Sequence, residues 1–126
     1  MKRLALLLAL CATAHAAPPD SFFRALHVVE TSGRTGPIIG DGGRALGPLQ
    51  IHRAYHADAR IGGDYSRCAD LDYSRRVVTA YLQRYAPAAW AAGDVKTLAR
   101  IHNGGPKGAT KTATVSYGDK VARLTK

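Results

Sequence analysis

Two carboxylic acids, Glu30 and Asp41, have the side chains and spacing best suited to chemistry in this sequence. Glu30 follows Leu26 by four positions and Phe23 by seven, so in a helix it shares a face with apolar residues. A carboxyl group pressed against apolar surface resists ionisation, and a raised pKa keeps it protonated as a general acid. Asp41 follows within a glycine-rich turn at 40–43, where the backbone lets a carboxylate approach a substrate.

Such a pair suits the hydrolysis of a glycosidic bond, which needs two carboxyl groups flanking the bond that breaks. A separation of roughly 5 Å favours a retaining mechanism, and roughly 6.5–9.5 Å leaves room for an attacking water. Each residue also has an ordinary interpretation. Glu30 alone is more often a solvated glutamate near a helix end, and Asp41 alone is a turn-stabilising residue.

The elements around this pair are mostly helical. Asp20 and Ser21 follow two prolines as helix-capping residues, and the apolar spacing behind them predicts a first helix over 20–32. The segment 33–47 holds six glycines and predicts a loop or a small turn-rich sheet, with 37–39 strand-like. Residues 48–60 return to helical spacing before Gly62 and Gly63 break the chain.

Further helices are predicted towards the C-terminus. Asp70 caps a helix that Pro87 stops, a short segment follows at 88–92, and Asp94 caps another helix through Ile101. A turn at 103–106 then leads to a last docked helix around 117–124. The pattern predicts an α+β fold, predominantly α-helical, with a small glycine-rich β-hairpin region after the first helix. Residues 17–126 form a single domain.

The N-terminus predicts export. Residues 1–3 are basic, 4–14 are almost unbroken apolar, and Ala14-His15-Ala16 has the small-x-small pattern of a cleavage site. The apolar run is shorter than the about 20 residues of a membrane span. We therefore predict a signal peptide over 1–16, cleavage after Ala16, no transmembrane segment, and a secreted or periplasmic protein.

The composition is strongly basic, with 18 Lys and Arg against 9 Asp and Glu and a formal net charge of +9. This charge either attracts polyanions such as an anionic cell-wall surface or keeps the protein soluble. The cations are scattered without a stacking-aromatic motif, so nucleic acid is not a predicted partner. Cys68 is the one cysteine after residue 16, which excludes an intramolecular disulfide, and a packed or partly exposed thiol is favoured over a nucleophile. No metal-binding pattern is present, and no cofactor or metal is predicted.

Two blocks of sequence carry a family resemblance. GDGGRALGPLQIHRAYHADA, preceded by VVETSGRTGP, resembles the active-site half of invertebrate-type lysozymes, the family that includes destabilase. LARIHNGGPKG, followed by a tyrosine and Lys120-Val121, is similar to the C-terminal signature of that family. The blocks span most of residues 26–121 in the expected order. The resemblance implies a lysozyme-like fold.

The resemblance also implies an activity and its residues. Glu30 would be the general acid and base, and Asp41 the nucleophile or charge stabiliser, of a retaining N-acetylmuramidase. Its substrate would be the glycan strands of peptidoglycan, cut at the β-1,4 bond between N-acetylmuramic acid and N-acetylglucosamine, with a bacteriolytic, antimicrobial effect. The predicted substrate-binding residues, each of which has an alternative structural role, are Gln50, His52, Tyr55, His102, Asn103 and Gly104.

The sequence departs from the family pattern in two ways. Animal members are dense in disulfides, whereas this chain must hold its cleft by packing. Ala45 and Leu46 stand where the family often has Ser and Cys, so we do not predict the isopeptidase activity attributed to some relatives. Two other functions remain open: a lytic transglycosylase that uses Glu30 alone and forms a 1,6-anhydro sugar, and a non-catalytic module that binds cell wall.

Overall fold

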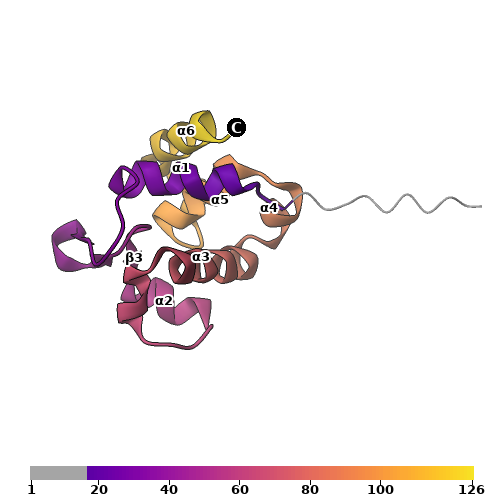
Figure 1. Cartoon of the computed structure of the whole chain (residues 1–126). Helices are drawn as coiled ribbons and strands as arrows, with labels where there is room; N and C mark the ends of the chain where they lie inside the picture. Colours follow the sequence, from indigo (N-terminus) through magenta and orange to yellow (C-terminus); the bar gives the residue numbers. More distant parts are fainter. Residues whose placement is uncertain (1–16) are drawn as a thin grey trace, which may run out of the picture.

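The computed structural model describes residues 17–126, so the predicted signal peptide over 1–16 lies outside the described residues (Figure 1). Six α-helices are found in the described part: α1 (Asp20–Thr31), α2 (Arg53–Ala59), α3 (Leu71–Tyr85), α4 (Pro87–Ala92), α5 (Val95–Gly104) and α6 (Val115–Leu124). The strands are β1 (Ile39–Gly40), β2 (Ala45–Leu46) and β3 (Ile51–His52). Four single-turn 3₁₀ segments connect them: η1 (Asp41–Gly43), η2 (Tyr65–Ala69), η3 (Gly108–Thr110) and η4 (Thr112–Thr114).

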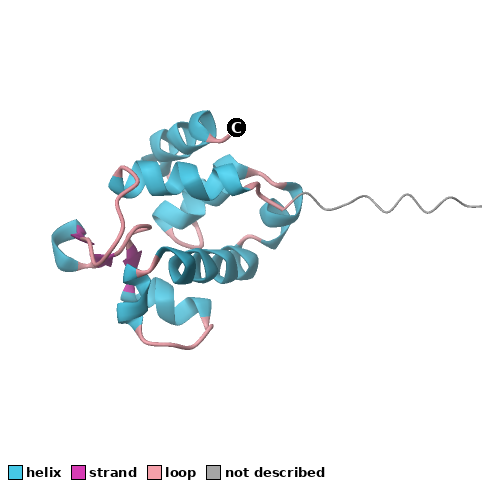
Figure 2. Cartoon of the chain, viewed as in Figure 1, coloured by secondary structure: helices cyan, strands magenta, loops and turns pink. Residues whose placement is uncertain are grey.

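The predicted α+β class is confirmed, because helices dominate and the strands form one small sheet after α1 (Figure 2). The sheet is antiparallel in the order β1-β2-β3. Ile39 pairs with Leu46, and Ala45 pairs with His52 across β2 and β3. Directly paired residues project to the same face of a sheet. Ala45 and His52 are therefore neighbours on one face.

The helix ends follow the predicted capping residues, with one exception. Asp70 accepts a hydrogen bond from the Tyr73 amide, and Asp94 accepts one from the Thr97 amide, as side-chain caps do. The exception is α1, where the prediction of a side-chain cap is wrong. Pro19 occupies the cap position and makes no such bond.

The predicted helix over 48–60 begins later than expected. Ile51 and His52 form β3 and pair with β2, so α2 begins at Arg53. The apolar residues Leu49 and Ile51 fit helical spacing and both are fully buried, but Ile51 pairs with Leu46 of β2. Pairing with β2 therefore outweighs the weak preference of residues 51–52 for a helix.

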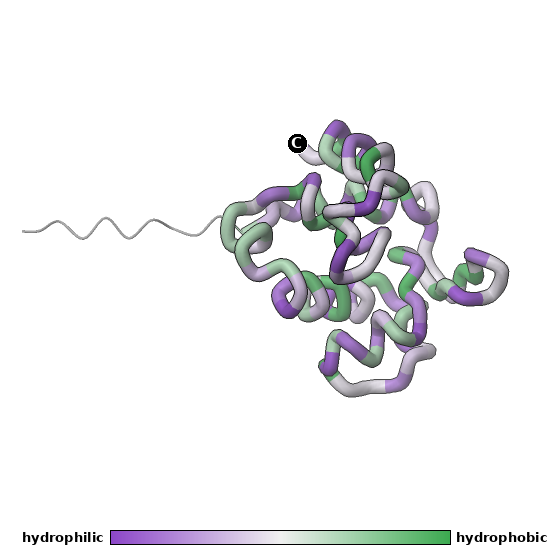
Figure 3. Tube along the Cα trace, turned by 180° about the vertical axis from the view of Figure 1, so that it is seen from behind, coloured by the Kyte–Doolittle hydropathy of each residue, from purple (hydrophilic) through white to green (hydrophobic). Residues whose placement is uncertain are grey.

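One hydrophobic core joins the helices to the sheet. Along the chain, hydrophobic and hydrophilic residues alternate in short stretches (Figure 3). Helix α6 packs on α1 and α5, whereas α2 packs on α3 (Figure 1). Side chains with no exposed surface come from every layer: Phe22, Leu26, Leu49, Ile51, Val77, Val78, Leu82, Leu98 and Val121. Within residues 17–126, no helix is long and apolar enough to cross a membrane.

Hydrogen bonds to backbone carbonyls fix the sheet region against the helices. The Thr31 hydroxyl donates to the Pro48 carbonyl at 2.8 Å and is buried, so it ties the end of α1 to the chain before β3. The Tyr65 hydroxyl donates to the Ile51 carbonyl at 2.5 Å.

Cys68 is fully buried, and burial raises the pKa of its thiol to about 11. Of the two predicted states of this thiol, packed or partly exposed, the structure shows the packed one.

Gly47 provides a test of how tightly this loop is packed. Its φ of +83° favours glycine, and a Cβ there would lie 1.8 Å from the Cys68 carbonyl oxygen. Gly33 has a similar φ of +77° but open space around it. We expect G33A to lower the free energy of unfolding by about 1 kcal/mol through backbone strain alone. We expect G47A to lower it by about 3 kcal/mol or more, because overpacking adds to the strain. Urea denaturation measures both, and equal losses would contradict the predicted clash.

Candidate active site

A cavity of about 540 Å³ opens between the end of α1, the sheet and the end of α5. It lies where two segments far apart in sequence, the glycine-rich region and the last turn of α5, come together. Its lining is predominantly polar, and the residues are Glu30, Asp41, Ala45, Gln50, His52, Tyr55, His102, Asn103 and Gly105. The two carboxylic acids singled out by the sequence therefore face one space.

Glu30 lies in the last turn of α1 with only 17% of its side chain exposed. The Tyr117 hydroxyl, on α6, donates a hydrogen bond to Glu30 Oε1 at 2.5 Å. Burial raises the pKa of Glu30, and the hydrogen bond from Tyr117 partly opposes this effect by stabilising the anion. Removal from water is the larger influence, so the carboxyl group holds its proton to a higher pH than an ordinary glutamate.

His102, on α5, forms another wall of the Glu30 site. Its Nε2 lies 3.7 Å from Glu30 Oε1, and its Nδ1 lies 2.8 Å from the Tyr55 hydroxyl. Only 3% of the imidazole is exposed, and burial lowers the pKa of His102 to about 4. The ring is therefore neutral at neutral pH. The His102 ring therefore places a polar but uncharged group beside the Glu30 carboxyl.

Asp41 has a different environment from Glu30. Its backbone has a φ of +50°, in the left-handed region that aspartate tolerates better than most residues. Arg44 Nη2 donates to one carboxylate oxygen at 3.1 Å, and His52 Nε2 lies 3.1 Å from the other. Nearly half of the side chain, 48%, is exposed. This carboxylate is thus open to solvent and faces a guanidinium, whereas the Glu30 side chain is largely enclosed between the Tyr117 hydroxyl and the His102 ring.

Five of the six predicted substrate-binding residues line the cavity, and some also have structural contacts. The Gln50 amide donates to the Ile38 and Gly47 carbonyls, which braces the turn beside β3. The Tyr55 ring stacks on Tyr81 with centroids 3.6 Å apart. His52, His102 and Asn103 complete this set, with Asn103 exposed at the end of α5.

Gly104 is the predicted residue that the lining does not include, and Gly105 lies there instead. A Cβ on Gly104 would lie 2.5 Å from Thr114 Cγ2. The absence of a side chain at Gly104 therefore permits the close approach of α5 to the 3₁₀ turn η4.

Tyr117 is the site residue that the motif analysis did not single out. It lies 87 positions from Glu30 in sequence and reaches it only because α6 packs on α1. In the sequence, Tyr117 is marked only as the tyrosine of the C-terminal block and as one of the apolar positions of the predicted last helix. Among residues 17–126, no group of three or more His, Cys, Asp or Glu side chains is placed to hold a metal ion.

Comparison with known proteins defines the class of fold first. The structure superposes on the lysozyme of Meretrix lusoria, solved in complex with Aeromonas hydrophila PliI, with a TM-score of 0.71 and 26% sequence identity. The match covers 86% of this chain and 91% of that one. The fold is therefore that of a lysozyme.

Sequence relatives then identify the family. The chain is 42% identical to the lysozyme of Ostrea edulis over 84 residues, 63% of this chain, and it spans 61% of that relative's length. It is 33% identical to invertebrate-type lysozyme 6 of Caenorhabditis elegans over 95 residues, which cover 66% of this chain and 69% of the relative. No protein-family model matches the chain. The chain belongs to the invertebrate-type lysozyme family, a family of lysozyme-type glycosidases.

The contact between Tyr117 and Glu30 predicts a measurable change in titration. The hydroxyl stabilises the ionised carboxylate, so Y117F is expected to raise the pKa of Glu30 above its wild-type value. Titration of the Glu30 side-chain carbon by ¹³C NMR measures this change. Y85F is the matched control, because Tyr85 lies at the end of α3 and does not line the cavity that holds Glu30. A Glu30 pKa that is unchanged or lower in Y117F would contradict the assigned role.

Proposed function

We propose that the protein is a secreted N-acetylmuramidase that hydrolyses the β-1,4 bond between N-acetylmuramic acid and N-acetylglucosamine in peptidoglycan. The observation that carries this proposal is the contrast between two carboxyl groups on one cavity. Glu30 is mostly enclosed and has a raised pKa, whereas Asp41 is half-exposed and accepts a hydrogen bond from Arg44. Paired carboxyl groups in opposed environments are the usual arrangement for acid and nucleophile in glycosidases.

The proposed reaction assigns each proton and bond. Glu30 donates its proton to the glycosidic oxygen as the bond from that oxygen to the anomeric carbon breaks. Asp41 either attacks the anomeric carbon or stabilises its positive charge. Glu30, now ionised, removes a proton from water, whose oxygen bonds to the anomeric carbon. Both side chains return to their starting states, and the configuration at the anomeric carbon is retained.

The other cavity residues support substrate binding in this scheme. His52 and Asn103 are exposed at the cavity and offer hydrogen-bonding groups to sugar hydroxyl and N-acetyl groups. Without residues 1–16, which hold Lys2 and Arg3, 16 Lys and Arg remain against 9 Asp and Glu. This net charge of +7 favours adsorption to an anionic cell-wall surface before any single bond is cut. The proposed biological effect is bacteriolysis, from a protein exported after cleavage at Ala16.

Glu30→Gln is the decisive variant for the catalytic acid. We expect it to lower turnover of purified peptidoglycan by about a hundredfold to ten-thousandfold in a turbidity assay, because the amide cannot donate a proton as an acid does. Activity equal to wild type, or a wild type without activity, would refute the proposal.

The same variant makes a prediction about stability. The folded pKa of Glu30 lies above its ordinary value of 4.5, so the wild type loses stability as the pH rises and the buried group ionises. The E30Q variant has no group to ionise at this position and does not lose this stability. Between about pH 4 and about pH 8, the free energy of unfolding of E30Q should therefore rise relative to that of the wild type, and urea titrations at the two pH values measure this difference. A shift the other way would contradict a raised pKa.

Asp41→Asn separates hydrolysis from transglycosylation. We expect D41N to abolish turnover and the wild-type products to carry new reducing ends, because a two-carboxylate hydrolase needs both groups. D72N, an exposed change in the first turn of α3, is the control that should keep wild-type activity. If D41N keeps cutting and the products lack reducing ends, the protein is a lytic transglycosylase.

A further inference from the structure

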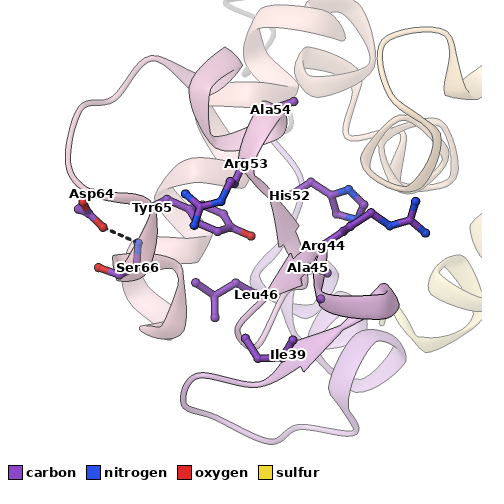
Figure 4. Close-up of a pocket in the computed structure, with 11 residues that line it drawn as sticks. Ile39, Arg44, Ala45, Leu46, His52, Arg53, Ala54, Asp64, Tyr65 and Ser66 are labelled. Carbon is purple, nitrogen blue, oxygen red and sulfur yellow. Dashed lines mark hydrogen bonds between the residues drawn. The ribbon is translucent and has the colours of Figure 1, made fainter.

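A second cavity of about 590 Å³ adjoins the candidate active site (Figure 4). The two cavities share Ala45 and His52, the cross-strand pair of β2 and β3. The second cavity extends from this pair towards η2 and the start of α2, on a part of the molecule that the proposed hydrolysis does not use. A chain bound at the first cavity therefore has an adjacent space open to any substituent that it carries.

The second cavity differs chemically from the first. Its apolar lining includes Leu46, Ala54 and Ile39. Ile39 is 63% exposed, although large aliphatic side chains are usually covered. Small apolar groups of a ligand would find aliphatic contact here, whereas the first cavity offers mostly polar groups.

Arg53 supplies a positive charge in this apolar setting. Its guanidinium lies 4.5 Å from the centroid of the Tyr65 ring, which the hydrogen bond to the Ile51 carbonyl holds in place (Figure 4). Within residues 17–126, no carboxylate lies within 4.0 Å of Arg53. The nearby Asp64 accepts a hydrogen bond from the Ser66 amide as the cap of η2. Asp64 lines the same cavity, and its pKa is lowered first by the hydrogen bonds from Ser66 and further by the charge of Arg53. Arg53 is thus a stacked, oriented donor that makes no direct ion pair among residues 17–126 and can pair with a ligand carboxylate.

This lining offers no open aromatic face to a sugar ring. Sugars pack on flat aromatic faces, but Arg53 covers one face of Tyr65 and His56 lies 5.8 Å from the centroid of that ring. Two arginines line this cavity, and Arg44 already donates to Asp41, which leaves Arg53 as the cation beside the small aliphatic contacts. That combination instead suits a short peptide with methyl side chains and a free carboxylate. In peptidoglycan, such an alanine-containing peptide hangs from the lactyl group of N-acetylmuramic acid.

We infer that the second cavity binds this stem peptide, with Arg53 pairing with one of its carboxylates and Leu46 and Ala54 contacting its methyl groups. The inference rests on the proposed function, since it takes the glycan strand to occupy the first cavity. Arg53 would be a specificity-determining residue that distinguishes peptide-bearing glycan from bare glycan. It would take no part in breaking the bond.

The test compares glycan strands with and without their peptides, the latter stripped by an amidase that cuts the lactyl–alanine bond. We expect R53Q to lower kcat/KM about five- to tenfold on peptide-bearing strands and to leave it unchanged on stripped strands, because a charge-assisted hydrogen bond is lost. A54F, which fills the cavity from an exposed position on α2, should have the same selective effect.

R67Q is the matched control. Arg67 also stacks on a tyrosine, 4.3 Å from the Tyr73 centroid, but does not line either cavity. It should leave both activities unchanged. An equal loss for R53Q on both substrates would mean that the cavity receives sugar, and no loss on either would mean that it receives nothing. Either result overturns the inference.

A binding measurement separates this inference from the proposed function. In the E30Q background, calorimetry should show that a disaccharide carrying the peptide binds about five- to tenfold more tightly than the bare disaccharide. The double variant E30Q/R53Q should lose that preference. If the wild type does not cut peptidoglycan, the proposed function fails, but the preference still decides the inference. Equal affinity for both ligands in E30Q refutes it.

Discussion

The burial of one carboxyl group, that of Glu30, is the constraint around which the molecule is arranged. Three helices contribute to it: α1 carries the residue, α6 brings the Tyr117 hydroxyl to 2.5 Å, and α5 brings the neutral His102 ring to 3.7 Å. Ionisation of a carboxyl group so enclosed is costly, because the charged form loses its contact with water. Glu30 therefore keeps its proton to a higher pH than an ordinary glutamate does. The surrounding core must be stable enough to maintain this unfavourable site, and it does so without a disulfide in residues 17–126.

The sheet region separates two cavities with different chemical linings. Ala45 and His52 lie between a polar cavity, which holds the two carboxyl groups, and an apolar one, which holds Arg53. His52 touches Asp41 from this boundary. Strands of two residues each would be unstable alone, so contacts with the helices maintain their register. The buried hydrogen bond from Thr31 to the Pro48 carbonyl connects α1, the helix that carries Glu30, directly to this sheet.

Much of the helical framework could be predicted from local sequence rules. Asp70 and Asp94 begin helices because their side chains satisfy free backbone amides nearby, and Pro87 interrupts α3 because it cannot donate a helical hydrogen bond. The rules failed where distant partners intervene. Residues 51–52 form a strand because β2 lies beside them. The spacing of apolar residues around 51–52 does not indicate that they pair with β2.

By itself, the sequence determined which residues carry reactive groups and which local segments hold them. Glu30 on an apolar helix face and Asp41 among glycines follow from short-range spacing. The tertiary structure decided what those groups meet. Tyr117 lies 87 positions away from Glu30, and Gly105, not Gly104, lines the cavity because Gly104 is needed for packing against η4. Periodicity and capping operate within a few residues, whereas the proton affinity of a buried acid depends on side chains that only the folded core brings together.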